Sequence, residues 1–133
     1  MANVLIINEK PSVSMEFSRV LGVKQTEKHD GYIEGYSDFF GCTIWITWCI
    51  GHLVTLSFPE KYDEKYKKWR YDDLPIVPEC WKHKVLEGTK KQFGILKKLM
   101  RDSKVDEVIC ATDAGREGEL IFRLVYELSL IHI

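Results

Sequence analysis

Two segments of the sequence, VLIINEKPS (residues 4–12) and VICATDAGREGE (residues 108–119), give the strongest indication of the fold class. Each begins as an apolar run and ends in charged residues, and continuous aliphatic runs are typical of strands buried on both faces of a parallel sheet. A helical pattern follows each run; Pro11 lies near the first turn of the first helix and Gly22 just beyond its end. Two such strand–helix units predict an α/β fold, an open parallel sheet flanked by helices and joined by right-handed crossovers.

The chain between these units predicts further elements. Residues 43–50 are rich in β-branched and aromatic side chains and predict a strand, whereas glycines punctuate the aromatic segment 32–40 and predict a hairpin or extended excursion there. Residues 59–80 predict a surface loop with some helix. The remaining expected elements are an amphipathic helix over 89–101, a buried strand over 105–111, and a helix over 116–127 with Leu120, Ile121, Leu124 and Val125 facing inward.

Composition indicates a globular chain of single-domain size. The 133 residues are 45% hydrophobic and 29% charged, which excludes a disordered chain. The net charge is −1, so a polyanionic partner must be met by a local basic patch rather than by the whole surface. One candidate patch is a stripe of seven basic residues, Lys82, Lys84, Lys90, Lys91, Lys97, Lys98 and Arg101.

The cysteines and apolar runs bear on the cellular setting. Cys42, Cys49, Cys80 and Cys110 form no C-x-x-C pair, so we expect four buried, reduced thiols rather than a zinc site. No apolar run approaches the roughly 18 residues of a membrane-spanning helix, and residues 4–7 are too few for a signal peptide. These features predict a cytoplasmic protein with no membrane partner.

The last six residues, LSLIHI (128–133), match the translation of a DNA adapter. They are the translation of the DNA sequence CTG TCT CTT ATA CAC ATC, a transposon end sequence used as an adapter in sequencing libraries. We therefore expect a domain over residues 1–127, the N-terminal part of a longer protein, and a translated adapter over 128–133. The alternative is a genuine helix end.

Acidic residues follow both decisive strands. Glu9 follows the first, Asp113 follows the second, and Glu117 lies four residues later on the same face of the next helix. Ligands bind beyond the carboxyl ends of parallel strands, and carboxylates with water and phosphate are the ligands of Mg²⁺. The neighbouring Lys10 and Arg116, with the helix N-terminus, suit a phosphate. Alternatively, these are solvated acids paired with Lys10 and Arg116.

Two glycines interrupt this acidic junction. Gly115 and Gly118 are poor helix formers at the start of a helix. Our interpretation is that the backbone must approach a ligand closely at this point.

These motifs resemble a known family. The segments NEKPS (8–12) and ATDAGREGE (111–119) look like the Toprim domain of type IA DNA topoisomerases, and most of all like its bacterial topoisomerase III branch. The resemblance covers residues 3–127 and implies a Rossmann-like Toprim fold. Further matching segments are Thr47-Trp48, Gly51-His52-Leu53, Trp69, residues 74–78 and residues 89–93.

The resemblance implies roles for individual residues. Glu9 matches a glutamate that binds metal and assists proton transfer, and Lys10 matches a lysine that contacts the phosphate at the scissile bond. Asp113 and Glu117 match the first and last acids of a D-x-D-x-E pattern, with Gly115 in place of the middle acid. The implied cofactor is Mg²⁺, with a smaller ligand set than the full pattern provides.

Three other positions complete the expected site. The resemblance implies that Trp69 and Arg116, together with Lys10, contact DNA, and Trp69 could stack on a base. A partly buried loop anchor is the alternative for Trp69. His52, which follows a strand, is expected to have a structural role.

The implied function is the Mg²⁺-dependent part of an enzyme that breaks, passes and rejoins single DNA strands without ATP. The family's nucleophile is a tyrosine in a later domain, so the expected partners are single-stranded DNA and missing C-terminal domains, and this chain alone should be inactive. The alternatives are the Toprim domain of a primase or nuclease, and a non-catalytic DNA-binding module. The matches at 47–53 and 74–78 favour the topoisomerase.

Overall fold

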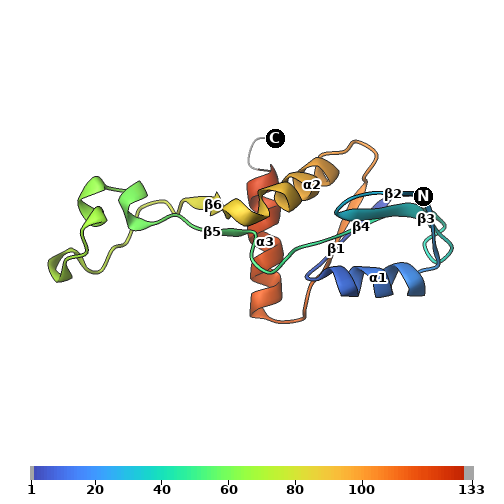
Figure 1. Ribbon diagram of the computed structural model, residues 1–133, viewed down its shortest axis with the longest axis horizontal. Helices are drawn as coiled ribbons and strands as arrows, with labels where there is room; N and C mark the ends of the chain where they lie inside the picture. The colour runs from blue at the N-terminus through green and yellow to red at the C-terminus, as the bar shows by residue number, and fades with distance from the viewer. Residues whose placement is uncertain (1, 131–133) are drawn as a thin grey trace.

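The computed structural model, which describes residues 2–130, contains a five-stranded sheet with helices packed against it (Figure 1). Strand β1 lies in the interior of the sheet and is parallel to both of its neighbours, β4 and β7. Strand β3 is antiparallel to β2 and β4, so it alone runs against the other four. In the order in which they lie, the strands are β2 (Val23–Lys28), β3 (Tyr32–Ser37), β4 (Cys42–Trp48), β1 (Val4–Asn8) and β7 (Glu107–Ala111).

Helices cover both faces of the sheet, which confirms the predicted α/β fold. Helix α1 (Pro11–Val20) packs on one face, where Phe17 contacts the cluster that contains Ile6. Helices α2 (Lys90–Met100) and α3 (Arg116–Leu130) pack on the other face. Because successive β1 side chains point to opposite faces, all five residues of this strand are buried.

After β4 the chain leaves the sheet and forms an arm. Strands β5 (Val54–Leu56) and β6 (His83–Val85) pair as an antiparallel ribbon, and residues 57–82 extend beyond it, away from the sheet (Figure 1). The expected loop with some helix is confirmed. Its short 3₁₀ helices are η1 (Pro59–Lys61), η2 (Glu64–Lys67) and η3 (Tyr71–Asp73), and a fourth, η4 (Glu87–Thr89), leads into α2.

Two burial predictions were wrong. The strand expected to be buried is β7, but its Cys110 is exposed and its Val108, Ile109 and Ala111 are only half-buried, because among the described strands it pairs only with β1. In α3, Leu120 is 43% exposed, whereas Phe122 takes an inward position. The faces of α3 are therefore rotated slightly from the expected ones.

The C-terminal hexapeptide is only partly described. Residues 128–130 continue α3, and the Arg101 guanidinium donates a hydrogen bond to the Ser129 carbonyl (2.8 Å). Residues 131–133 lie outside the described residues, so the adapter interpretation stays a prediction. Over residues 2–130, none of the helices has the length and apolar character needed to cross a membrane.

Candidate functional site

The carboxyl ends of three neighbouring strands meet at one edge of the sheet. Asn8, the last residue of β1, pairs with Trp48 of β4 on one side and with Ala111 of β7 on the other. The segments that follow these residues are therefore neighbours, and helices α1 and α3 both begin beside them. We call this region the strand-end site, and its segments are residues 9–10, 49–53 and 112–117.

Hydrogen bonds hold the first of these segments. The Asn8 side-chain amide donates to Ser14 Oγ (2.9 Å), and Ser14 Oγ donates to the Thr47 carbonyl (3.3 Å). The Cys49 N–H donates to the Asn8 carbonyl (2.8 Å). The turn after β1 is thus tied to α1 and β4. It presents Glu9 half-buried and Lys10 exposed.

The second segment makes a tight turn from β7 into α3. The Gly115 N–H donates to the Asp113 carbonyl (2.8 Å), and Thr112 Oγ1 donates to the Gly118 carbonyl (2.9 Å). A Cβ atom at Gly118 would lie 2.1 Å from the Asp113 carbonyl oxygen, whereas one at Gly115 would meet nothing within 4 Å. We interpreted both glycines as positions where the backbone approaches a ligand, and this needs correction. Glycine is required at position 118 because the backbone of residue 118 packs against the backbone of Asp113.

His52 contacts one of the expected metal ligands. Its Nε2 lies 2.9 Å from Glu117 Oε2, and both side chains are partly exposed. The structural role expected for His52 therefore takes a specific form, contact with a candidate ligand 65 residues away. The Gly51-His52-Leu53 match was the only sequence signal for this pair.

Glu119 belongs to a different surface. Its carboxylate accepts hydrogen bonds from the Arg123 guanidinium one turn later, at 2.6 and 3.0 Å. This contact raises the pKa of Arg123. Glu119 is thus close to the strand-end site in sequence, but its carboxylate is bound by Arg123. It therefore provides a matched control for experiments on the acids of the site.

The donor set suits Mg²⁺, although its members are not gathered into a cage. Within residues 2–130, no three acidic, histidine or cysteine side chains are grouped closely enough to hold a metal ion. Mg²⁺ commonly keeps several waters and takes only one or two protein carboxylates with substrate phosphate. Glu9, Asp113 and Glu117 offer hard oxygen ligands at one edge of the sheet, so the chemistry of these residues fits this ion.

The cations of the strand-end site are not paired. Lys10 and Arg116 are exposed, and neither forms an ion pair with any side chain of the described residues. The alternative in which they neutralise the neighbouring acids is therefore not what the structure shows. Their charges stand beside the N-termini of α1 and α3, which also attract anions.

The structure does not bring Trp69 to the strand-end site. This residue is 79% exposed and lies on the arm, so it is not the buried anchor considered as an alternative. The expected basic stripe is also interrupted: Lys90 pairs with Glu87 (2.7 Å) and Lys91 with Asp30. The hydrogen bond from Lys91 holds the pKa of the Asp30 carboxyl below its ordinary value.

Only two of the four cysteines are buried, which corrects the expectation for the other two. Cys42 and Cys49 are buried, whereas Cys80 and Cys110 are exposed. Burial of the Cys49 thiol, together with the nearby negative charge of Glu9, raises its pKa from 9.0 to about 12.

The cysteines should react at two different rates. In the folded protein we expect Cys80 and Cys110 to react rapidly with a thiol reagent at pH 8, and Cys42 and Cys49 to react only after addition of urea. The pKa of the Cys49 thiol is higher in the folded protein than in the unfolded chain. The contribution of the protonated thiol to the free energy of unfolding is therefore complete below about pH 9 and is lost as the pH rises towards 12. Thiol counts with and without urea check the prediction, and four rapid thiols in the native protein would contradict it.

The fold agrees with comparisons to known proteins. A family model described as the Toprim domain matches residues 4–131, and the chain belongs to this family. It is 48% identical over 127 residues to the DNA topoisomerase 3 of Bacillus thuringiensis (strain Al Hakam), and 46% identical over 123 residues to that of Staphylococcus epidermidis (strain ATCC 12228). These matches cover 96% and 92% of the chain but only 16% of each relative. The predicted resemblance to the topoisomerase III branch is confirmed.

Proposed function

We propose that residues 1–127 are the Toprim portion of a type IA DNA topoisomerase, an ATP-independent isomerase that breaks, passes and rejoins single DNA strands. The observation that carries the proposal is the meeting of Glu9, His52 and the 112–117 segment at one strand end in a Toprim chain. The relatives named DNA topoisomerase 3 favour this reaction over that of a primase or nuclease. The expected location is the cytoplasm.

Phosphate binding is the first task of the strand-end site. Lys10 and Arg116 are exposed cations without acidic partners among the described residues, and two helices begin beside them. Oriented N–H groups and fixed positive charges bind a phosphate and stabilise charge that develops on it. A DNA backbone crossing this edge would therefore be held with a phosphate close to Glu9.

The acids have separate tasks. Glu9, whose side chain is half-buried, is proposed to hold and move a proton at the scissile bond. Glu9, Asp113 and Glu117 would hold Mg²⁺, with His52 positioning the Glu117 carboxylate. When bound, Mg²⁺ neutralises phosphate charge and orients the reacting group.

The nucleophile is proposed to come from another part of a longer protein. Five of the six tyrosines lie on other parts of the fold: Tyr36 on β3, Tyr62, Tyr66 and Tyr71 on the arm, and Tyr126 on α3. The sixth, Tyr32, pairs with Thr47 near the end of β4. Burial, reinforced by nearby acids, also raises the pKa of Tyr32, which makes it a poorer nucleophile. The chain spans 16% of the length of its relatives, so domains beyond it would supply this group and complete the DNA-binding path.

Mg²⁺ should bind weakly at the strand-end site. We expect NMR signals of Glu9, Asp113 and Glu117 to shift on titration with Mg²⁺, because carboxylates at one edge are its natural ligands. Glu9→Gln should reduce the affinity, whereas Glu119→Gln should leave it unchanged because Glu119 is bound by Arg123. Gly115→Asp should increase the affinity, since the open space at this position admits a further carboxylate. Absence of Mg²⁺-dependent shifts at all three acids would reject the proposed metal site.

A further inference from the structure

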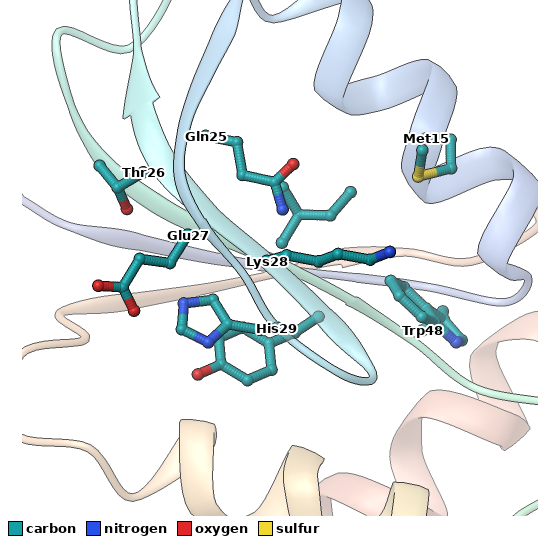
Figure 2. Close-up of a pocket in the computed structure, with 9 residues that line it drawn as sticks. Met15, Gln25, Thr26, Glu27, Lys28, His29 and Trp48 are labelled. Carbon is teal, nitrogen blue, oxygen red and sulfur yellow. The ribbon is translucent and has the colours of Figure 1, made fainter.

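A cavity lies beside the strand-end site, between α1 and the β2–β3 hairpin. Its volume is about 340 Å³, within the range of roughly 300–1,000 Å³ that small-molecule sites occupy. The walls come from α1, β2 and the end of β4, and the buried Ile33 of β3 is part of the lining. We call it the hairpin cleft, and four of its side chains carry the argument: Met15, Gln25, Lys28 and Trp48 (Figure 2).

These four side chains combine flat apolar surface with polar groups. Figure 2 shows Gln25 and Lys28 extending from β2 towards Met15 of α1 and Trp48 of β4, whereas Glu27 points to the opposite side. Glu27 also belongs to the lining, but the Lys28 ammonium is the charged group that extends towards α1 and Trp48. Met15 is 61% exposed, so its thioether is available to a ligand.

Trp48 places the hairpin cleft next to the strand-end site. Trp48 pairs with Asn8, the residue that precedes Glu9, so the indole comes from the same strand ends as the proposed catalytic residues. Met15 lies in the second turn of α1, the helix that follows Lys10. A chain molecule bound at Lys10 can therefore reach the cleft along α1.

We infer that the hairpin cleft binds one unpaired nucleotide of a single DNA strand that also crosses the strand-end site. Trp48 and Met15 contact the base, since stacking on an aromatic face is the usual way to bind any unpaired base. The Gln25 amide donates to or accepts from the base edge, and Lys28 contacts a phosphate. The inference rests on the proposed function and names a binding position for its substrate.

The other candidate occupant is a protein segment, such as a part of the longer relatives that this chain does not contain. The Lys28 charge beside the Trp48 aromatic surface favours the nucleotide, because it pairs an anion site with a stacking site. Titration of DNA into this chain alone distinguishes the two candidate occupants.

The test uses the 133-residue chain and a thymidine oligonucleotide about eight nucleotides long, in buffer containing EDTA. We expect the Trp48 indole N–H and the amides of residues 25–28 to shift on titration. Met15→Ala and Lys28→Gln should each weaken binding about three- to tenfold, and Lys28→Gln should reduce the salt dependence by about 0.7 in log–log slope. A duplex of the same length should leave these signals unmoved.

Matched controls come from the same two elements. Val20→Ala removes a 69% exposed apolar side chain at the other end of α1, and Lys24→Gln removes a β2 lysine that pairs with Asp38 (3.0 Å). Both should change the affinity less than twofold, as expected for exposed groups outside the cleft. All four positions are exposed, so the variants should fold.

Two results would overturn the inference. One is DNA binding that shifts only signals of the arm or strand-end site and is unchanged by Met15→Ala and Lys28→Gln. The other is the absence of any oligonucleotide-dependent shift in the cleft, the result that a protein occupant would give. The Mg²⁺ titration is a separate measurement, so the cleft can fail while the proposed metal site stands, and the reverse.

Discussion

Gly118→Ala is expected to destabilise the protein by about 3 kcal/mol, the upper end for overpacking of a well-packed site. The new Cβ would lie 2.1 Å from the Asp113 carbonyl oxygen and 2.9 Å from the Asp113 nitrogen. These are backbone atoms, so no side-chain rotation relieves the contact, and the turn from β7 into α3 must open. Urea denaturation followed by circular dichroism measures the loss.

Gly115→Ala is the matched control for this substitution. It lies three residues earlier in the same turn, its φ is not positive, and a Cβ there meets nothing within 4 Å. We expect an unchanged or slightly increased stability, up to about 1 kcal/mol, because alanine restricts the unfolded chain. Equal effects of the two substitutions would show that the turn is flexible enough to accept any residue, against the packing described here.

Loss of the Glu9 carboxylate is expected to reduce DNA strand cleavage at least about 100-fold, the lower end of the contribution of a positioned acid or base. The experiment uses a full-length protein that carries this Toprim region, with Glu9→Gln, and measures cleavage of a single-stranded oligonucleotide in Mg²⁺. The physical reason is that glutamine keeps the size of the side chain but removes its proton transfer and its charge for the metal. The 133-residue chain alone should give no cleavage.

Glu119→Gln in the same protein serves as the control. Glu119 is held by Arg123 on the surface of α3, so its loss should change cleavage by less than about threefold, as for an exposed ion pair. Circular dichroism should confirm that both variants fold. Cleavage by Glu9→Gln at the rate of the unmodified protein would remove Glu9 from the proposed mechanism.

The elements that the sequence predicted share a strong local signal. Strand β1 is a continuous aliphatic run, and α2 repeats its apolar side chains with helical spacing, so burial and secondary structure agree. Strand β2 was not predicted because its residues are mostly exposed and polar. It forms because it pairs with β3, and the local pattern of polar and apolar residues does not indicate this pairing. The same holds for β5 and β6, which are three residues long and pair with each other.

The candidate site was likewise predicted from the sequence only in part. Parallel strands place Glu9 and Asp113 at one edge, which followed from the two decisive stretches alone. The contact between His52 and Glu117 required the strand order, because β4 lies beside β1 in space although the two strands are separated by α1 and a hairpin. The role of Gly118 likewise required the distance to Asp113.

Local patterns within short segments were therefore enough to establish the α/β class, the family and the strand ends that carry the acids. The tertiary structure decided which segments became neighbours: the exposed edge of β7, the His52 contact, the exposed thiol of Cys110 and the hairpin cleft. The physical reason is that strand order and side-chain pairing are set by packing between distant segments, and that packing leaves no signal in the local alternation of polar and apolar residues.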